Sequence, residues 1–392
     1  MAINTDILIV GGGIMGSAAA YYLASSEAFN GSITVIERDA TYSRASTPRS
    51  AGGVRQQFSI RENVEIGLYA RQFIDRASEL LAVDDPVDLG FVEAGYLFLA
   101  GPEGRQILKD NHQVQTEAGA DISWLEPEEL GQRFPYVNLD GVSAACFGER
   151  GEGWMDPNTL LQAFRKKARA LGVTYIEDEV TAIERRGIEV KSATLASGEV
   201  IEFGRMIVSA GANSGAVMRM MGLDLPVGPR KRVIYQFDCR EELSPKLPLT
   251  IDPSGVFVRT EGKGFICGVS PPEEHDPETW DMEVDWRWYE ELVWPAIAHR
   301  IPAFEAIKLT GAWAGFYDYN ALDQNAIVGP HPMISNLLVA TGFSGHGFQQ
   351  GPAIGRALME LVTTGSYQTI DLTRFGVERI LNKQPLFEQN VV

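Results

Sequence analysis

Three glycines near the start of the chain have the type and spacing of a site that binds phosphate groups. Gly11, Gly13 and Gly16 form a GxGxxG motif directly after the apolar run 7–10. The first glycine permits a tight turn, the second lets the backbone approach a pyrophosphate, and the third lets a helix pack closely on a strand. A helix beginning near Gly13 would point its free N–H groups at the phosphates. The motif therefore predicts dinucleotide binding.

Glu37 follows a second apolar run, residues 33–36. A carboxylate at the end of this strand can accept hydrogen bonds from both ribose hydroxyls and would repel a 2′-phosphate, so NADP is disfavoured. Residues 7–37 alone leave NAD and FAD equally open. The uncharged stretch 7–24 could be mistaken for a signal peptide or membrane span, but Asp6 precedes it and no Lys or Arg occurs before Arg38. We therefore expect neither.

A second glycine-rich stretch lies near the other end of the chain. The apolar run 337–340 predicts a buried strand, residues 342–351 a glycine-rich turn, and residues 353–362 a helix. In the middle of the chain, an apolar strand ends at Ala210 and Gly211, where bare backbone can approach a ligand. Glycine turns contributed from both ends favour one large cofactor touched by both, which tilts the choice to FAD.

The loop 38–60 is rich in Ser, Thr, Arg and Gly. Loops of this length inside compact domains are usually functional, although a solvated connection is the alternative. Hydroxyls, bare backbone and positive charge are available there from Ser46, Thr47, Gly52, Gly53, Arg49 and Arg55.

The elements that position these residues alternate between helix and strand. Helical spacing of apolar residues covers 61–83 and 104–118, and Asp156 with Pro157 opens a helix that stops at Gly172. Strands are predicted at 173–176, 180–185, 188–195 and 200–203, and nothing in 86–135 indicates chemistry. The alternating pattern between residues 228 and 268 indicates a separate antiparallel sheet. We expect an α/β protein with a Rossmann-type, parallel-sheet FAD-binding domain and a second, α+β substrate domain with a mainly antiparallel sheet.

The two domains are expected to interleave, because the cofactor motifs lie at both ends and in the middle of the chain. The FAD-binding domain would comprise residues 1–86, 150–226 and 322–392. The substrate domain would comprise residues 87–149 and 227–321.

Composition narrows the possible partners. A chain of 392 residues with a formal net charge of −18 disfavours nonspecific binding to nucleic acid or anionic membranes, but not an anionic substrate at a local site. Three dispersed cysteines, Cys146, Cys239 and Cys267, indicate neither a zinc site nor a redox dithiol, and the five histidines show no metal-ligand spacing. We expect no metal and a cytoplasmic protein with a small-molecule partner.

At this point the sequence resembles the FAD-dependent oxidoreductases of the D-amino-acid oxidase superfamily, which includes sarcosine oxidase, glycine oxidase and dimethylglycine dehydrogenase. The resemblance covers nearly the whole chain through GGGIMG with Glu37, EDEVTAIE, MIVSAGANS and, most specifically, GFSGHGFQQGPAIG. Within the superfamily, STPRSAGGVRQQFS, WAGFYDYNALDQN and VGPHP resemble the mitochondrial FAD-dependent oxidoreductase domain proteins linked to complex I assembly. Without a recognisable transit peptide, a bacterial catalytic relative is expected.

The resemblance assigns roles by position. The opening glycines would hold the FAD pyrophosphate, Glu37 the adenosine ribose and the Val180 backbone the adenine. Residues 342–349 would lie along the flavin ring, where N–H groups and a helix dipole favour the negative charge of the reduced ring. The expected FAD-binding residues are Gly11, Gly13, Ile14, Met15, Gly16, Glu37, Arg38, Ser46, Thr47, Gly52, Gly53, Val180, Ala210, Gly211, Gly342, Gly345, His346, Gly347, Phe348 and Gln349.

The sequence departs from the family pattern at positions that bear on flavin linkage, oxygen reactivity and substrate binding. Arg49 stands where sarcosine and dimethylglycine dehydrogenases have a flavin-linking His, and Gly315 where monomeric sarcosine oxidase has its linking Cys, so FAD should be noncovalent. Ile266 occupies the position of an oxygen-activating Lys, with Lys263 nearby in a turn. Gln349 replaces a Lys that helps to hold the substrate carboxylate. Rapid reaction with oxygen is therefore in doubt, and the electron acceptor is oxygen or another partner.

The implied reaction oxidises the C–N bond of an amino acid or of a secondary or tertiary amine bearing a carboxylate, of N-methyl amino acid or iminodiacid type. Hydride would pass to flavin N5 and water would hydrolyse the imine. Arg259 and Arg55 are the candidates to bind the carboxylate, and Tyr317 and His346 the candidates to hydrogen-bond the substrate or exclude water. The alternatives are a 2-hydroxy-acid dehydrogenase on the same fold, or a flavin-bearing assembly or interaction protein.

Overall fold

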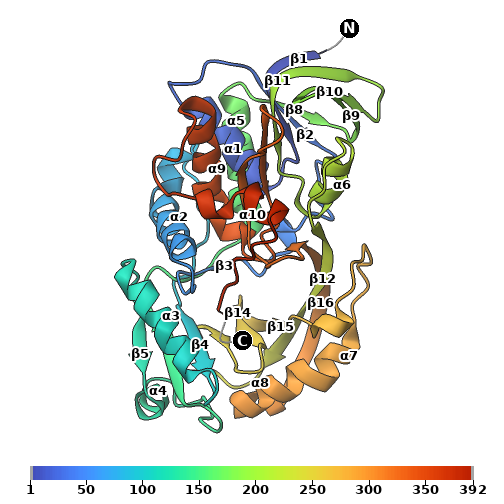
Figure 1. Cartoon of the computed structure of the whole chain (residues 1–392). Coiled ribbons are helices and arrows are strands. Elements are labelled where there is room, and N and C mark those ends of the chain that lie inside the picture. The colour runs from blue at the N-terminus through green and yellow to red at the C-terminus, as the bar shows by residue number, and fades with distance from the viewer. Residues whose placement is uncertain (1–2, 390–392) are drawn as a thin grey trace.

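The first of two large sheets is built around the opening strand of the chain. The computed structural model describes residues 3–389, and Figure 1 shows this sheet in its upper half. The strand order is β17-β18-β11-β1-β2-β8, with β10 and β9 joined to β11 as an antiparallel ribbon. Pairing is parallel from β18 through β11, β1 and β2 to β8, and antiparallel between β17 and β18. The strands are β1 Ile3–Val10, β2 Ile33–Glu37, β8 Thr174–Glu177, β9 Val180–Arg186, β10 Glu189–Leu195, β11 Val200–Val208, β17 Ile327–Pro330 and β18 Leu337–Thr341.

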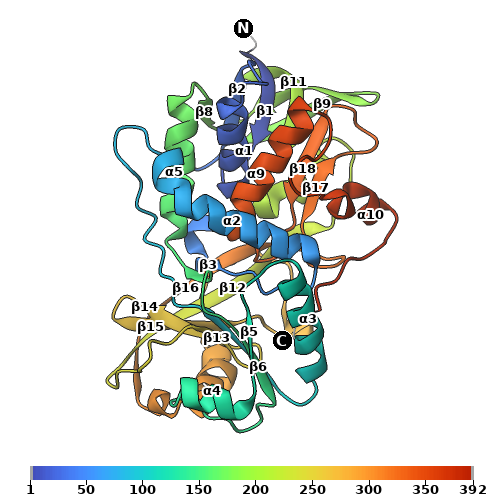
Figure 2. The same cartoon turned by 90° about the vertical axis from the view of Figure 1, so that its left-hand side faces the viewer.

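Both faces of this sheet are covered, which explains the unbroken apolar runs of its strands. Ile7 and Ile9 face a core shared with four helices, whereas Leu8 and Val10 face a core formed with the β9–β10 ribbon and the short helix α6. The four helices are α1 Ile14–Ser25, α2 Arg61–Leu80, α5 Pro157–Ala170 and α9 Gly347–Thr363; α6 is Ser214–Arg219 and the late helix α10 is Val377–Leu381. In Figure 2, α5, α1 and α9 run roughly upright, and α2 crosses their lower parts.

Helix α9 begins earlier than the sequence pattern predicts. The expected turn 342–351 is wrong in its second half, because the helix starts at Gly347. A Cβ on Gly351 would lie 2.6 Å from Ile14 Cγ1, and one on Gly355 would lie 2.7 Å from the Ala18 Cβ. These two glycines therefore serve close packing of α9 on α1, and only residues 342–346 form the turn.

The second sheet forms the lower half of the molecule in both views (Figures 1 and 2). Its order is β16-β12-β15-β14-β13-β4-β6-β5, and all its pairs are antiparallel except β13 with β4. Its strands are β4 Tyr96–Ala100, β5 Ser123–Leu125, β6 Ala144–Gly148, β12 Val227–Cys239, β13 Leu249–Ile251, β14 Phe257–Glu261, β15 Gly264–Val269 and β16 Ile307–Asn320. The parallel sheet above and the mainly antiparallel sheet below confirm the expected α/β class.

Helices cover the face of the second sheet that points away from the first domain. Leu97 and Leu99 of β4 pack with Leu130 of α4 (Pro127–Arg133), while Phe237 of β12 packs with Ile297 of α8 (Trp294–Arg300). Because side chains alternate along a strand, Tyr96 and Phe98 point to the opposite face. Helix α7 is Trp286–Trp288, whereas helix α3, Arg105–Glu117, packs through Leu108 on the opposite face with Tyr96 and Phe98. A small two-stranded sheet joins β3 Gly53–Val54 to β7 Gly153–Trp154.

The structure differs from the predicted elements at β11 and agrees with them at the start of α5. Residues 200–203 and 206–208 are one strand, β11, instead of two, because Gly204 lets the strand pass close to the backbone of Asp6, where a Cβ would lie 3.0 Å from the Asp6 oxygen. The predicted cap is confirmed: the Asp156 carboxylate accepts from the N–H groups of Asn158 and Thr159 at 3.1 and 3.2 Å. No helix within residues 3–389 is both long and apolar enough to cross a membrane. The domain boundaries stay a prediction.

Candidate functional site

A cavity of about 980 Å³ is lined by residues of both sheets and of the loops between them. This volume lies at the upper end of the range for small-molecule sites, about 300–1,000 Å³. Its lining starts at the glycine turn after β1, continues past the carboxyl ends of β2 and β11, and ends on the inner face of the second sheet. The cavity therefore has room for a long ligand that touches both domains.

The opening glycines form one end of this cavity. Gly11 has φ +100°, and a Cβ there would lie 2.4 Å from the Ser209 carbonyl oxygen. A Cβ on Gly16 would lie 1.9 Å from the Gly11 oxygen, so this glycine serves helix packing and does not line the cavity. Gly13 is the N-cap of α1 with no side-chain cap, and a Cβ on it would meet nothing closer than Thr47 Oγ1 at 3.9 Å. Open space and uncapped N–H groups thus meet where a pyrophosphate is expected.

Glu37 lies at the end of β2 and lines the same end of the cavity. Its two carboxylate oxygens accept from the backbone N–H groups of Gly12 at 2.8 Å and Asp39 at 3.0 Å. Burial raises the pKa of Glu37, and these two N–H groups oppose the rise. Each oxygen keeps a free lone pair, so the carboxylate is held in place to accept from two vicinal hydroxyls.

Most of the other residues expected at FAD also line the cavity. Gly52 does not, because a Cβ on it would lie 2.1 Å from the Met155 oxygen; this glycine serves close packing of the loop. Gly342 also lies outside the lining, and its φ of +72° serves the turn. The expected residues that do line the cavity are Gly11, Gly13, Ile14, Met15, Glu37, Arg38, Ser46, Thr47, Gly53, Val180, Ala210, Gly211, Gly345, His346, Gly347, Phe348 and Gln349.

The second glycine turn is held from below by buried polar groups. The Asp318 carboxylate accepts from the Phe343 N–H at 3.1 Å, and burial raises the pKa of Asp318 to about 6. Gly345 has φ +104°, and a Cβ on it would lie 2.4 Å from the Tyr317 ring. Ser344 Oγ accepts from the Asn320 N–H at 2.9 Å. The turn therefore presents backbone and the uncapped N-terminus of α9 to the cavity.

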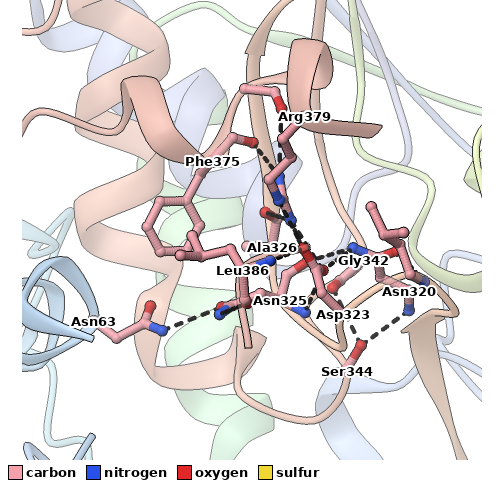
Figure 3. A network of polar contacts seen from close by, with 12 residues as sticks. Asn63, Asn320, Asp323, Asn325, Ala326, Gly342, Ser344, Phe375, Arg379 and Leu386 are labelled. Carbon is pink, nitrogen blue, oxygen red and sulfur yellow. Dashed lines mark hydrogen bonds and ion pairs between the residues drawn. The ribbon is translucent and has the colours of Figure 1, made fainter. Parts of the chain in front are cut away.

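The motif NALDQN, residues 320–325, anchors this turn instead of contacting the cavity. Figure 3 shows Arg379 of α10 reaching Asp323, with an ion pair of 2.8 Å between Nε and Oδ2. Asn320 Nδ2 donates to Asp323 Oδ1 at 2.7 Å, and both side chains are buried. The NALDQN motif thus positions the second glycine turn and does not itself line the cavity.

Arg55, His346 and Gln349 meet at the other end of the cavity. Arg55 Nη2 lies 3.1 Å from His346 Nε2, and the guanidinium lies over the rings of Phe58 and Phe98, 4.4 and 5.2 Å from their centroids. Gln349 hydrogen-bonds the Arg55 backbone. Burial and the neighbouring Arg55 lower the pKa of His346 to about 3, so its ring is neutral near pH 7.

Arg259, the other carboxylate anchor expected from the sequence, does not reach the cavity. Its Nε and Nη2 donate to the Ala51 carbonyl at 3.1 and 2.6 Å, and its Nη1 donates to the Thr260 carbonyl and pairs with Glu261. The side chain is 4% exposed and absent from the lining. Its donors are used to hold the loop before Gly52, so of the two predicted anchors only Arg55 lines the cavity. Tyr317 does line the cavity.

The sequence alone does not predict a role for the inner face of β4 or for the carboxyl group of Glu152. Tyr96 and Phe98 line the cavity, which corrects the view that residues 86–135 carry no chemistry. The alternation of aromatic and aliphatic residues in YLFLA was the available signal. Glu152 is fully buried and accepts from the Gln56 and Gln57 N–H groups, and no local pattern indicated it.

FAD fits this arrangement on structural grounds. Two uncapped helix N-termini, an open space beside Gly13 and an oriented Glu37 carboxylate lie along one elongated cavity. At the two positions expected from the resemblance to correspond to covalent flavin links, Arg49 donates to the carbonyls of Ser43 and Ala314, and Gly315 adjoins it; neither is a nucleophile. Among residues 3–389, no cluster of His, Cys, Asp and Glu could hold a metal ion.

Known proteins resemble this chain over almost its full length. The model of the FAD dependent oxidoreductase family, DAO, matches residues 6–361. FAD-dependent oxidoreductase domain-containing protein 1 of Xenopus laevis is 43% identical, over 99% of this chain and 85% of that protein. Monomeric sarcosine oxidase of an Arthrobacter species is 25% identical, over 97% of each chain. The crystal structure of L-proline dehydrogenase from P. horikoshii superposes with a TM-score of 0.86 at 26% identity, covering 98% of this chain and all of that one.

Proposed function

Because this chain belongs to the DAO family of FAD-dependent oxidoreductases, we propose that it oxidises the C–N bond of an amino acid or an amine that bears a carboxylate. FAD, when bound, supplies the two-electron oxidant that accepts the hydride from the carbon of that bond. Water then hydrolyses the imine to a carbonyl compound and an amine. The observation that supports this substrate class is the state of Arg55, a cation in the cavity with no carboxylate partner among the described residues.

Arg55 is suited to bind a carboxylate in bidentate fashion. Among residues 3–389, its side chain donates only to His346, so its remaining N–H groups are available to a ligand. The aromatic faces of Phe58 and Phe98 fix the plane of the guanidinium. The charge of Arg55 also acts on the buried Glu152 carboxylate, but the two form no ion pair, so the guanidinium can still pair with a substrate carboxylate.

His346 orients Arg55 and does not act as a general base. Because a guanidinium can only donate, His346 Nε2 must accept from Arg55, and the ring proton must lie on Nδ1. The low pKa of this imidazole keeps it from taking a further proton near pH 7. The amine is therefore expected to react as its free base, positioned by its carboxylate.

The relatives support the same chemistry. L-proline, sarcosine and glycine, the compounds in the names of three similar proteins, all carry an amine on the carbon next to a carboxylate. These compounds belong to other proteins, but an amine next to a carboxylate agrees with Arg55, a cavity-lining arginine that forms no ion pair with a carboxylate among residues 3–389.

Residues around the cavity support a slow reaction with oxygen and a noncovalent cofactor. Ile266 is buried in β15, and Lys263 is exposed in the turn before it. Over the part of the chain that the structure describes, the basic residues of the lining are Arg38, Arg44, Arg49, Arg55 and Arg232, with no lysine. We expect a dehydrogenase that passes electrons to another acceptor.

Anaerobic reduction of the bound flavin tests the proposal directly. Carboxylate-bearing secondary amines should bleach its visible absorbance, and hydroxy acids should not. Bleaching by hydroxy acids alone would replace the amine with a 2-hydroxy acid, and no bleaching with any compound would contradict catalysis and favour an assembly role. Repeating the reaction in air measures the oxygen reactivity. Acid precipitation should leave all of the FAD in the supernatant.

A further inference from the structure

The cavity wall next to Arg55 is an apolar platform on the inner face of the second sheet. Tyr96 and Phe98 of β4 pair with Leu249 and Ile251 of β13, and Ile251 pairs in turn with Phe257 of β14. Residues that pair directly across strands share a face of the sheet. All five side chains line the cavity, so Tyr96, Phe98, Leu249, Ile251 and Phe257 form a continuous apolar surface.

The positive group of the site lies at one edge of this platform. The Arg55 guanidinium carbon is 5.2 Å from the centroid of the Phe98 ring. A ligand whose carboxylate binds Arg55 would therefore place its remaining atoms over aliphatic and aromatic side chains. A ligand as small as glycine would leave most of this platform facing water.

A second carboxylate of a ligand would find no unpaired cation near the platform among the residues that the structure describes. Arg232 of β12, which lines the cavity from the second sheet, already forms a bidentate pair with Asp276 at 2.7 and 2.8 Å. Arg49 donates to two backbone carbonyls. Binding a dicarboxylate would require breaking the pair with Asp276, whereas a monocarboxylate leaves it intact.

We infer that the substrate is a monocarboxylate amine with a bulky apolar substituent, aromatic or branched, lying on the Tyr96–Phe257 platform, and not a glycine-sized compound or an iminodiacid. This inference rests on the proposed function, because it takes Arg55 as the carboxylate anchor. The inference extends the proposed function by naming the part of the substrate that lies away from the carboxylate.

Binding of acids that cannot be oxidised tests the platform without turnover. Acetate, succinate and phenylacetate would be titrated into the FAD-loaded protein, with the flavin absorbance spectrum as the readout. Phenylacetate should bind at least about tenfold more tightly than acetate, because its ring leaves water, and succinate should bind no more tightly than acetate. This comparison needs only the wild-type protein.

Variants locate the effect on the platform. Phe257→Ala should weaken phenylacetate about fivefold or more while leaving acetate unchanged, and Phe257→Leu should restore most of the affinity. Phe387→Ala is the matched control, because Phe387 is 54% exposed and does not line the cavity. Arg55→Met should weaken all three acids.

Failure of the platform inference and failure of the Arg55 anchor give different results. If acetate or succinate binds as tightly as phenylacetate, or if Phe257→Ala weakens acetate and phenylacetate alike, the platform inference is overturned while the proposed function stands. If no acid perturbs the flavin and no amine bleaches it, the Arg55 anchor is overturned, and the inference with it.

Discussion

The side-chain amide of Gln349 forms hydrogen bonds with both the N–H and the carbonyl group of Arg55. Its Oε1 accepts from the Arg55 N–H at 2.6 Å, and its Nε2 donates to the Arg55 carbonyl at 3.1 Å. Gln349 lies in the first turn of α9, directly after the second glycine turn, whereas Arg55 follows β3 in the loop after the first domain's second strand. One side chain therefore sets the position of the proposed carboxylate anchor relative to the cofactor end of α9.

Gln349→Met should loosen this anchor. The variant leaves the N–H and carbonyl of Arg55 without partners, so we expect a loss of about 1–3 kcal/mol in the free energy of unfolding. Acetate affinity should fall about tenfold, since a displaced guanidinium loses bidentate geometry. Urea unfolding and flavin titration measure the two effects. Gln350→Met is the control: Gln350 donates to Asn63 at 3.1 Å and lies outside the cavity, so it should lose stability and keep acetate affinity.

The two arginines predicted as anchors should respond in opposite ways. Arg55→Met should lower carboxylate affinity by about a hundredfold, as expected for the loss of a charge-assisted bidentate pair, with a small change in melting temperature. Arg259→Met should lower the melting temperature, because the Ala51 and Thr260 carbonyls lose a donor, and the folded protein should bind acetate normally. Weaker acetate binding by folded Arg259→Met would return the anchor role to Arg259.

Glu152 should make stability fall as pH rises. Burial raises the pKa of Glu152 to about 7 from the ordinary 4.5 in spite of bonds from Gln56 and Gln57. The folded state therefore binds its proton more tightly than the unfolded state, and this stabilisation is complete below pH 4.5 and lost as pH rises through 7. From about pH 5 to about pH 8, the free energy of unfolding of Glu152→Gln should gain about 2–3 kcal/mol relative to wild type.

The difference between the two proteins is the quantity to measure, because other buried groups also titrate. Asp318, with its raised pKa, contributes a change of the same sign, and His346, with its lowered pKa, a change of the opposite sign. Both are present in each protein and cancel in the difference. A difference that stays constant with pH would show that Glu152 is ionised throughout.

The cofactor end of the site could be predicted from local sequence, and the substrate end could not. Gly11, Gly13 and Glu37 act through the turn, helix and strand that contain them, so their spacing alone indicates their roles. The role proposed for Arg55 depends on its contacts with Gln349 and His346, which lie almost three hundred residues later in the sequence. Nothing local distinguishes it from Arg259, whose donors are consumed by neighbouring carbonyls.

The sequence does not show whether a glycine serves ligand binding or the close packing of two segments. Gly351 and Gly355 follow a glycine-rich turn and look like its continuation, yet they lie inside α9 and allow it to approach α1. The same applies to Gly204 within β11. A missing Cβ indicates close approach, and only the fold shows whether a ligand or another segment makes that approach.

Trp280 crosses from the second domain to the rim of the cofactor cavity. Its side chain is 41% exposed and also lines the cavity. Its carbonyl accepts from Arg44 Nη2 at 2.7 Å, and the Arg38 guanidinium lies 5.8 Å from its ring centroid. The ring edge packs on Phe316 with centroids 5.2 Å apart. Because Arg38 and Arg44 belong to the loop after Glu37, we expect Trp280 to cover the route by which FAD would leave.

Trp280→Ala should therefore release FAD faster, by about tenfold if the ring contributes about 1.4 kcal/mol to closing the rim. The rise of flavin fluorescence after dilution measures release without any turnover. Trp286→Ala is the matched control, because Trp286 is 43% exposed and does not line the cavity, so its release rate should equal that of wild type. Trp280→Phe should lie between, since it keeps an aromatic face for Arg38. Equal rates in Trp280→Ala and Trp286→Ala would show that the cofactor leaves by another route.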